Sequence, residues 1–350
     1  MIQQSESSDR PTGSAHRSYR FGVAIIVLTI VAAAAGLAAA FAQGGEKKAM
    51  SDSVVATLHV AGRPSGIAAG ADALWVALIY PQQKTSKLVR LDPATGAVRK
   101  TIAIKGFASS TIRAGNSLWV GANGDWFDKT NGTFREFDRK TAALKNIIPF
   151  AHPVFGAAYG DESLWFVVGR APATLVQVDA TTSRVIGKPI RLDRARVIGL
   201  AFGAGAVWAT GFEDGRLIRV DAKTRRVTTA RVGEGPVGVV VAGGRVWVAN
   251  RSSGTVSRID PNTMHEDGQQ IRVGTFPTWI ASAAGSIWVS NQSDGTVSRI
   301  DEKTGETVGS AVRIAAPADD AAAHVMSAAG DSLWVASATE HTLSRIHPSA

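Results

Sequence analysis

Short apolar runs separated by polar turns recur along the chain from about residue 53 onward. Seven of these runs carry a tryptophan that follows Leu, Val or Ile. The runs are rich in β-branched residues and show no 3.6-residue stripe, which favours strands over helices. The clearest copies are VWVANRSSGTVSRIDPNT (246–263) and IWVSNQSDGTVSRIDEKT (287–304). The tryptophans lie 39 to 46 residues apart, at Trp75, Trp119, Trp165, Trp208, Trp247, Trp288 and Trp334.

Each repeat except the last continues into an aspartate with a threonine three residues later. An aspartate that opens a turn accepts hydrogen bonds from the N–H groups two and three residues on. Pro93 and Pro261 suit the second position of such a turn, and Gly96 and Gly305 allow a positive φ before the next strand. We therefore expect hairpin turns at Asp92, Asp138, Asp179, Asp221, Asp260 and Asp301.

Each repeat divides into four strands, of which the second carries the tryptophan. Repeats of this length with four strands each are typical of propeller blades. The last repeat stops after its third strand, whereas SVVATLHVAG (53–62) precedes the first repeat and resembles a fourth strand. The sequence thus predicts an all-β fold, a seven-bladed β-propeller over residues 53–350. The N-terminal strand 53–60 is expected to complete the last blade and close the ring.

The region before the repeats reads as a targeting segment. Residues 21–42 form a charge-free apolar run long enough to span a bilayer as a helix, and basic residues 1–20 precede it. We expect a transmembrane signal anchor, with a signal peptide cleaved after Ala42 as the alternative. Residues 43–52 form a linker. The propeller then lies outside the cytoplasm, on a single-pass membrane protein or, after cleavage, in a secreted or periplasmic form.

Charge and composition narrow the chemistry. The 350-residue chain has a net charge of +9 and no cysteine, which excludes disulfides, thiolate metal sites and cysteine nucleophiles. A basic chain suits acidic partners. Its expected export argues against nucleic acid, and no zinc, phosphate-loop or serine-hydrolase motif is present.

The repeated [LVI]-W-V, V-S-R-I-D and x-x-T-G pattern resembles the YVTN and NHL-type bacterial propellers. It also looks like the repeat of streptogramin B (virginiamycin B) lyase. The resemblance implies the fold, and it allows extracytoplasmic binding domains, sensors and metal-dependent enzymes. The lyase family uses His and Glu from adjacent blades with Mg²⁺. At the first-strand positions this chain offers one histidine, His324, while His152 belongs to the third blade. We therefore expect no catalytic residues and no cofactor, with a Mg²⁺ or Ca²⁺ site as the less favoured alternative.

Candidate binding residues lie where strands begin and where second strands lead into third strands, because ligands usually bind that face of a propeller. The loop 122–133 in the second blade is unusually long and presents four candidates. Arg194 and Arg196, together with the loop residues Arg170 and Arg251, would form a basic mouth suited to anionic ligands. Weaker candidates are Tyr80, Phe155, Phe212 and His341. The main candidates are Asp125, Trp126, Phe127, Asp128, Arg194, Arg196, Trp279 and His324. The alternatives are loop aromatics that fold back onto neighbouring blades and solvated loop arginines.

One further set of residues repeats too regularly to mark a site. Arginine fills one position of five repeats, at Arg90, Arg219, Arg258, Arg299 and Arg345. We interpret these arginines as structural and the seven repeated tryptophans as core. The function we expect is a monomeric, non-catalytic binding or scaffold protein of the cell envelope. Its partner would be a protein or an anionic envelope component, and a metal-dependent lyase or lactonase is the alternative.

Overall fold

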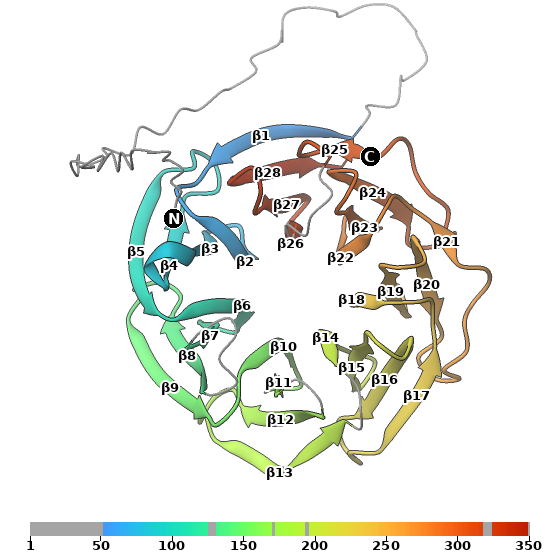
Figure 1. Cartoon of the computed structure of the whole chain (residues 1–350), viewed down its shortest axis with the longest axis horizontal. Helices are drawn as coiled ribbons and strands as arrows, with labels where there is room; N and C mark the ends of the chain where they lie inside the picture. Colours follow the sequence, from blue (N-terminus) through green and yellow to red (C-terminus); the bar gives the residue numbers. More distant parts are fainter. Residues whose placement is uncertain (1–51, 125–130, 170–171, 193–195, 318–323, 349–350) are drawn as a thin grey trace, which may run out of the picture.

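Seven four-stranded antiparallel sheets stand around a common axis as the blades of a propeller (Figure 1). The computed structural model describes residues 52–124, 131–169, 172–192, 196–317 and 324–348. Each repeat forms one blade, which we number 1 to 7 in the order of the seven tryptophans. The predicted seven-bladed propeller of four-stranded blades is confirmed.

The two inner strands of every blade are six to eight residues long, and in blades 1 to 6 their register shifts near the start of the first strand. The first strands surround the central axis: β2 (Arg63–Ala69), β6 (Phe107–Ala114), β10 (Val154–Gly160), β14 (Val197–Gly203), β18 (Pro236–Ala242), β22 (Pro277–Ala283) and β26 (His324–Ala329). The second strands carry the tryptophans: β3 (Leu74–Tyr80), β7 (Ser117–Asn123), β11 (Ser163–Val168), β15 (Ala206–Gly211), β19 (Arg245–Asn250), β23 (Ser286–Asn291) and β27 (Ser332–Ser337).

The two outer strands finish each blade. The third strands are β4 (Thr85–Leu91), β8 (Gly132–Asp138), β12 (Ala173–Asp179), β16 (Arg216–Asp221), β20 (Thr255–Ile259), β24 (Thr296–Asp301) and β28 (Thr342–His347). The outermost strands are β5 (Val98–Lys105), β9 (Leu144–Phe150), β13 (Val185–Leu192), β17 (Val227–Arg231), β21 (Ile271–Arg272), β25 (Val312–Arg313) and β1 (Ser53–His59). A short 3₁₀ helix, η1 (Pro81–Gln83), joins β3 to β4.

Blade 7 is assembled from both ends of the described chain. Its sheet has the order β1-β28-β27-β26, and β1 runs antiparallel to β28 with Ser53 opposite His347 and His59 opposite Thr342. The sequence analysis assigned residues 53–60 to this blade. The pairing covers the edge of β28, which would otherwise be open to another chain.

The tryptophans hold the blades to one another. All seven are at most 2% exposed. Seven buried apolar clusters follow the ring, and each joins residues of two neighbouring blades around one tryptophan. Trp247 of blade 5, for example, packs with Ile280, Ile287 and Val289 of blade 6. The core is therefore a circle of interfaces, and the interpretation of these residues as core is confirmed.

The repeated arginines pack beside the tryptophans at these interfaces. Each lies directly opposite the tryptophan on the neighbouring strand, as in the pairs Trp247↔Arg258 and Trp288↔Arg299. In four blades the guanidinium lies 5.4 to 5.9 Å from the centre of the indole ring. Arg90 also donates to the carbonyl of Lys140, in the turn of the next blade. The structural interpretation of these arginines is confirmed.

Where arginine is absent from this position, another side chain makes the same connection to the next blade. In blade 2, Glu136 accepts from the hydroxyl of Ser183, and in blade 3, Gln177 accepts from Arg225. In blade 6, Arg299 pairs with Asp52 at 2.8 Å, with both side chains largely buried. Asp52 precedes β1 of blade 7. At the interface between blades 6 and 7 it therefore takes the place of the turn that Arg90 contacts between blades 1 and 2.

The Asp-x-x-Thr segments form the predicted turns in all six repeats. In each, one carboxylate oxygen accepts from the N–H groups two and three residues on, as Asp221 does from Lys223 and Thr224. These bonds favour the charged carboxylate, and with the Thr224 hydroxyl and Arg219 they lower the pKa of Asp221 to about 2. Gly96 and Gly305 take the expected positive φ of 72° and 78°.

Two outermost strands are shorter than the four-strand repeat predicts. β21 and β25 contain two residues each, and isolated bridges Ile259↔Glu266 and Ile300↔Thr307 precede them. Gly268 and Gly309 lie between bridge and strand with φ of 86° and 63°. A positive φ turns the chain out of the extended conformation, so the ladder is interrupted in blades 5 and 6.

The predicted segments 1–20 and 21–42, and most of the linker 43–52, lie outside the described residues. Among the residues that are described, no helix has the length and apolar character needed to cross a membrane.

Removing one interface tryptophan should weaken the whole ring. Trp247→Ala deletes a fully buried indole between blades 5 and 6, and we expect a loss of about 3–5 kcal/mol from the cavity and the lost transfer energy. Thermal melting of the full chain measures this loss. Val227→Ala, at a position 40% exposed on β17, is the matched control and should change stability by less than about 0.5 kcal/mol. Equal melting temperatures for the two variants would contradict the interface role.

Candidate functional site

The two ends of the ring have different parts. The turn face carries the Asp-x-x-Thr turns, whose polar groups bond to one another and to the neighbouring blade. The entry face carries the start of every first strand, the loop between second and third strands and the end of every outermost strand. Its loops dock on the segments that enter the blades: Phe212 N–H donates to the carbonyl of Arg196, Arg251 N–H to Gly235 and Gln292 N–H to Phe276. Some side chains of these loops take part as well, since Ser253 accepts from Glu234 N–H and Asp294 accepts from Thr275 N–H.

Basic side chains recur where the outermost strands reach the entry face. Arg231, Arg272 and Arg313 occupy one register position, each opposite the first residue of the third strand of its blade. Lys105 takes the same position in blade 1, opposite Thr85, and all four side chains are exposed. Arg191 in blade 3 lies opposite Thr174, next to the start of β12. We call these five residues the basic rim.

Two further arginines stand over aromatic rings inside this rim. The guanidinium of Arg196 lies 5.6 Å from the ring centre of Phe212, and that of Arg251 lies 4.3 Å from the ring centre of Phe276. An aromatic face attracts a cation and holds it in place. Both arginines are therefore oriented without the use of a carboxylate.

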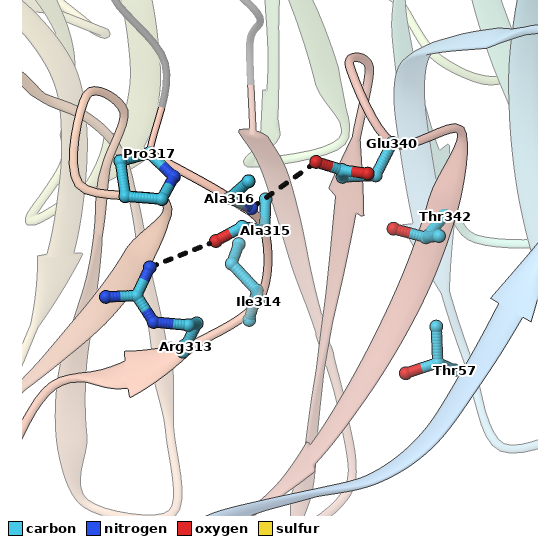
Figure 2. Close-up of a pocket in the computed structure, with 8 residues that line it drawn as sticks. All are labelled: Thr57, Arg313, Ile314, Ala315, Ala316, Pro317, Glu340 and Thr342. Carbon is cyan, nitrogen blue, oxygen red and sulfur yellow. Dashed lines mark hydrogen bonds between the residues drawn. The ribbon is translucent and has the colours of Figure 1, made fainter.

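Three cavities open between the loops of blades 4 to 7. One of about 720 Å³ lies between β25 and the third strand of blade 7, where Arg313 donates to the carbonyl of Ala315 and the carboxylate of Glu340 accepts from Ala316 N–H (Figure 2). One of about 480 Å³ in blade 4 combines Arg231 with Glu213, Asp214 and Glu234. One of about 290 Å³ in blade 5 contains Arg251 and Arg272.

Five of the predicted candidates lie outside the described residues. They are the long-loop residues Asp125, Trp126, Phe127 and Asp128, together with Arg194. Arg170, a further part of the predicted basic mouth, lies there too. The described members of that mouth, Arg196 and Arg251, are both on the entry face, each over an aromatic ring.

Trp279 and His324 are placed on adjacent inner strands, β22 and β26. Trp279 is half-buried and packs against the cluster that joins blades 7 and 1, and its indole N–H has no hydrogen-bond partner among the described residues. His324 is 2% exposed, and its Nδ1 likewise has no described partner. Burial lowers the pKa of His324, while the negative charge of Glu340 opposes that shift. His324 is thus enclosed, whereas Trp279 is partly accessible.

The basic rim was missed by the sequence analysis, although a signal was present. The tripeptide Arg-Val-Gly occurs at 231–233 and again at 272–274, just before the next blade begins, and Arg313 follows after a further 41 residues. The role of Phe276 was also missed, because a single aromatic residue before a proline carries no repeat signal.

The described residues contain no group of three or more His, Asp, Glu or Cys side chains that could hold a metal ion. The carboxylates Glu213, Asp214 and Glu234 around the cavity of blade 4 therefore do not constitute such a group.

Comparison with known proteins supports the fold. No protein-family description matches the chain, and no curated protein does. Among solved structures it is similar to virginiamycin B lyase from Staphylococcus aureus, with 13% identity, a TM-score of 0.64 and coverage of 83% of this chain and 98% of that one. A catalytically inactive variant of that lyase with quinupristin gives 14% identity, a TM-score of 0.64 and the same coverage. A chain of the mitotic checkpoint complex gives 14% identity, a TM-score of 0.70 and coverage of 90% and 97%. The chain therefore has a propeller fold of the kind found in virginiamycin B lyase.

The buried His324 should make stability depend on mildly acidic pH. Its folded-state pKa lies below the unfolded value of about 6.5, so the unfolded chain binds the proton first and stability is lost as pH falls below that value. His324→Gln removes the titration and should melt at a nearly constant temperature between about pH 7 and pH 5, where the parent chain loses stability. Parallel curves for the two proteins would show that His324 does not contribute.

Proposed function

We propose that this protein is a non-catalytic binding module of the cell envelope that recognises a polyanionic component through its entry face. The observation that carries the proposal is the basic rim, which recurs at the entry face of blades 1, 3, 4, 5 and 6. The arginines that face the interface tryptophans serve packing, whereas the exposed rim residues Arg231, Arg272 and Arg313 lie at the opposite end of their blades. The chain thus presents cations around one face of a rigid ring.

The course of the chain supports an outward orientation of this face. Ser53 pairs with His347 at the turn face, so the chain enters β1 from that side. The linker 43–52 spans at most about 35 Å when fully extended. If residues 21–42 cross the membrane as their sequence predicts, the turn face lies toward the bilayer and the entry face points away from it. The basic rim is then directed at components beyond the membrane surface.

Neutralising part of the rim should weaken binding to an anionic polymer. We expect the double variant Arg231→Gln and Arg313→Gln in the full-length chain to bind immobilised polyphosphate or polyglutamate about two- to thirtyfold more weakly, since exposed ion pairs contribute about 0.2–1 kcal/mol each. Binding should also fall with added salt. The matched control, Lys223→Gln with Lys303→Gln, removes the same charge from the turn face. Equal losses for both variants would reduce the effect to net charge and contradict recognition by the entry face.

A metal-dependent lyase or lactonase is the second candidate, and the likeness to virginiamycin B lyase favours it. Titration of EDTA-treated full-length protein with Mg²⁺ or Ca²⁺ tests it by thermal melting. A specific site at about 100 times its Kd adds about 2.7 kcal/mol of stability. The binding proposal expects no saturable shift, whereas a saturable shift would favour the enzyme.

A further inference from the structure

The cavity of blade 5 differs from the other two entry-face cavities in its charge. Its wall is made by residues 251–254, from the loop between β19 and β20, and by residues 272–276, between β21 and β22. Two arginines and no carboxylate line it. The cavity of blade 4 contains three carboxylates beside Arg231, and the cavity between blades 6 and 7 contains Glu340 beside Arg313. The charged residues that line the blade 5 cavity are thus both arginines.

The repeat itself shows that Arg251 is not required by the fold. The equivalent loop residue, whose N–H donates to the segment entering the blade, is Gly169 in blade 3, Phe212 in blade 4 and Gln292 in blade 6. The outer-strand arginine, by contrast, is shared by blades 4, 5 and 6. Among these three, the pair of a loop arginine and a rim arginine occurs in blade 5 alone.

The two guanidinium groups are free to take a ligand. Arg251 is held over Phe276, and Arg272 is exposed, with no carboxylate of the described residues within 4 Å of either. The carboxylate of Asp294 accepts from Thr275 N–H at 2.6 Å, so it lies against the backbone of this cavity wall, although it forms no ion pair with Arg251 or Arg272. Glu234 lines the cavity of blade 4. Ser252 and Thr275 add hydroxyl groups at the edge of the cavity.

We propose that the blade 5 cavity binds one oxyanion group of the ligand, a phosphate or a carboxylate, between Arg251 and Arg272. This inference deepens the proposed function, on which it rests. Planar guanidinium groups bind such anions through paired N–H donors, and fixing one of them over an aromatic ring reduces the entropy lost on binding. A volume of about 290 Å³ accommodates a compact anionic group, while the rim arginines contact the rest of a longer polymer.

The test is isothermal titration of the full-length chain with pyrophosphate and, separately, with citrate, at constant ionic strength. We expect saturable binding that Arg251→Gln weakens roughly tenfold or more, since hydrogen bonds to charged groups are the strong ones. That substitution gives blade 5 the residue of blade 6. Arg272→Gln should act alike, and Arg251→Lys should recover part of the affinity. Lys223→Gln, at an exposed position on the turn face, is the matched control for a lost positive charge and should bind as the parent chain does.

The outcomes separate the sources of the anion. Binding of pyrophosphate alone supports a phosphate-bearing ligand, binding of citrate alone a carboxylate-bearing one, and binding of both supports recognition of oxyanions in general. Absence of saturable binding, or an equal loss in Arg251→Gln and Lys223→Gln, would overturn the proposal. If Arg251→Gln changed the melting temperature and left the titrations unchanged, the role of Arg251 would be limited to packing over Phe276, and the proposal would fail. The polymer-binding experiment on Arg231 and Arg313 leaves the cavity intact, so the wider function can succeed where the cavity fails.

Discussion

The burial of one tryptophan between each pair of neighbouring blades is the interaction on which the rest of the structure depends. A single four-stranded sheet has two apolar faces and cannot bury either of them alone. Each indole covers the face of the next blade, and the ring brings the last blade against the first, where Trp334 packs with Ile67 and Val76. Every blade is thus supported on both sides. The stability of each interface consequently depends on all seven being present.

The same packing explains why the turn face and the entry face differ in how their side chains are used. At the turn face, the third-strand side chain opposite the tryptophan reaches the turn of the next blade, as Arg90 reaches Lys140 and Glu136 reaches Ser183. The polar groups there are used for joining blades. At the entry face, the backbone bonds of the loops lie within one blade, as Phe212 N–H donates to the carbonyl of Arg196. Side chains make the bonds between blades there, as Asn123 donates to the carbonyl of Val154. The loop position of Arg251 is held through its backbone N–H, so the side chain at that position can vary from blade to blade.

Sequence reasoning succeeded where a feature repeats and was weaker where it does not. The blades, the buried tryptophans and the six turns follow from a sequence pattern that recurs seven times, which is a strong signal for a repeated structure. The shortened β21 and β25 depend on the positive φ of single glycines, Gly268 and Gly309, which no periodicity signals. Among the site residues, Arg251 was indicated by its loop position, whereas its support by Phe276 depends on a contact between two blades. The rim arginines also repeat, as in the Arg-Val-Gly tripeptides at 231–233 and 272–274, but they were not predicted.

A repeat protein carries its own control for separating structural residues from functional ones. A position that holds the same residue in most blades, such as that of Arg258 and Arg299, meets a structural requirement common to the blades, here packing beside the tryptophan. A position that changes freely, from Gly169 to Phe212 to Arg251 to Gln292, answers no such demand, so a charged residue there has to be explained by something outside the blade. Arg251 meets that condition, and it stands beside a rim arginine that its own blade shares with its neighbours. Blade 5 thus combines Arg272, which has equivalents in blades 4 and 6, with Arg251, which has none there. The packing of the ring does not explain why both residues line one cavity that no carboxylate residue lines.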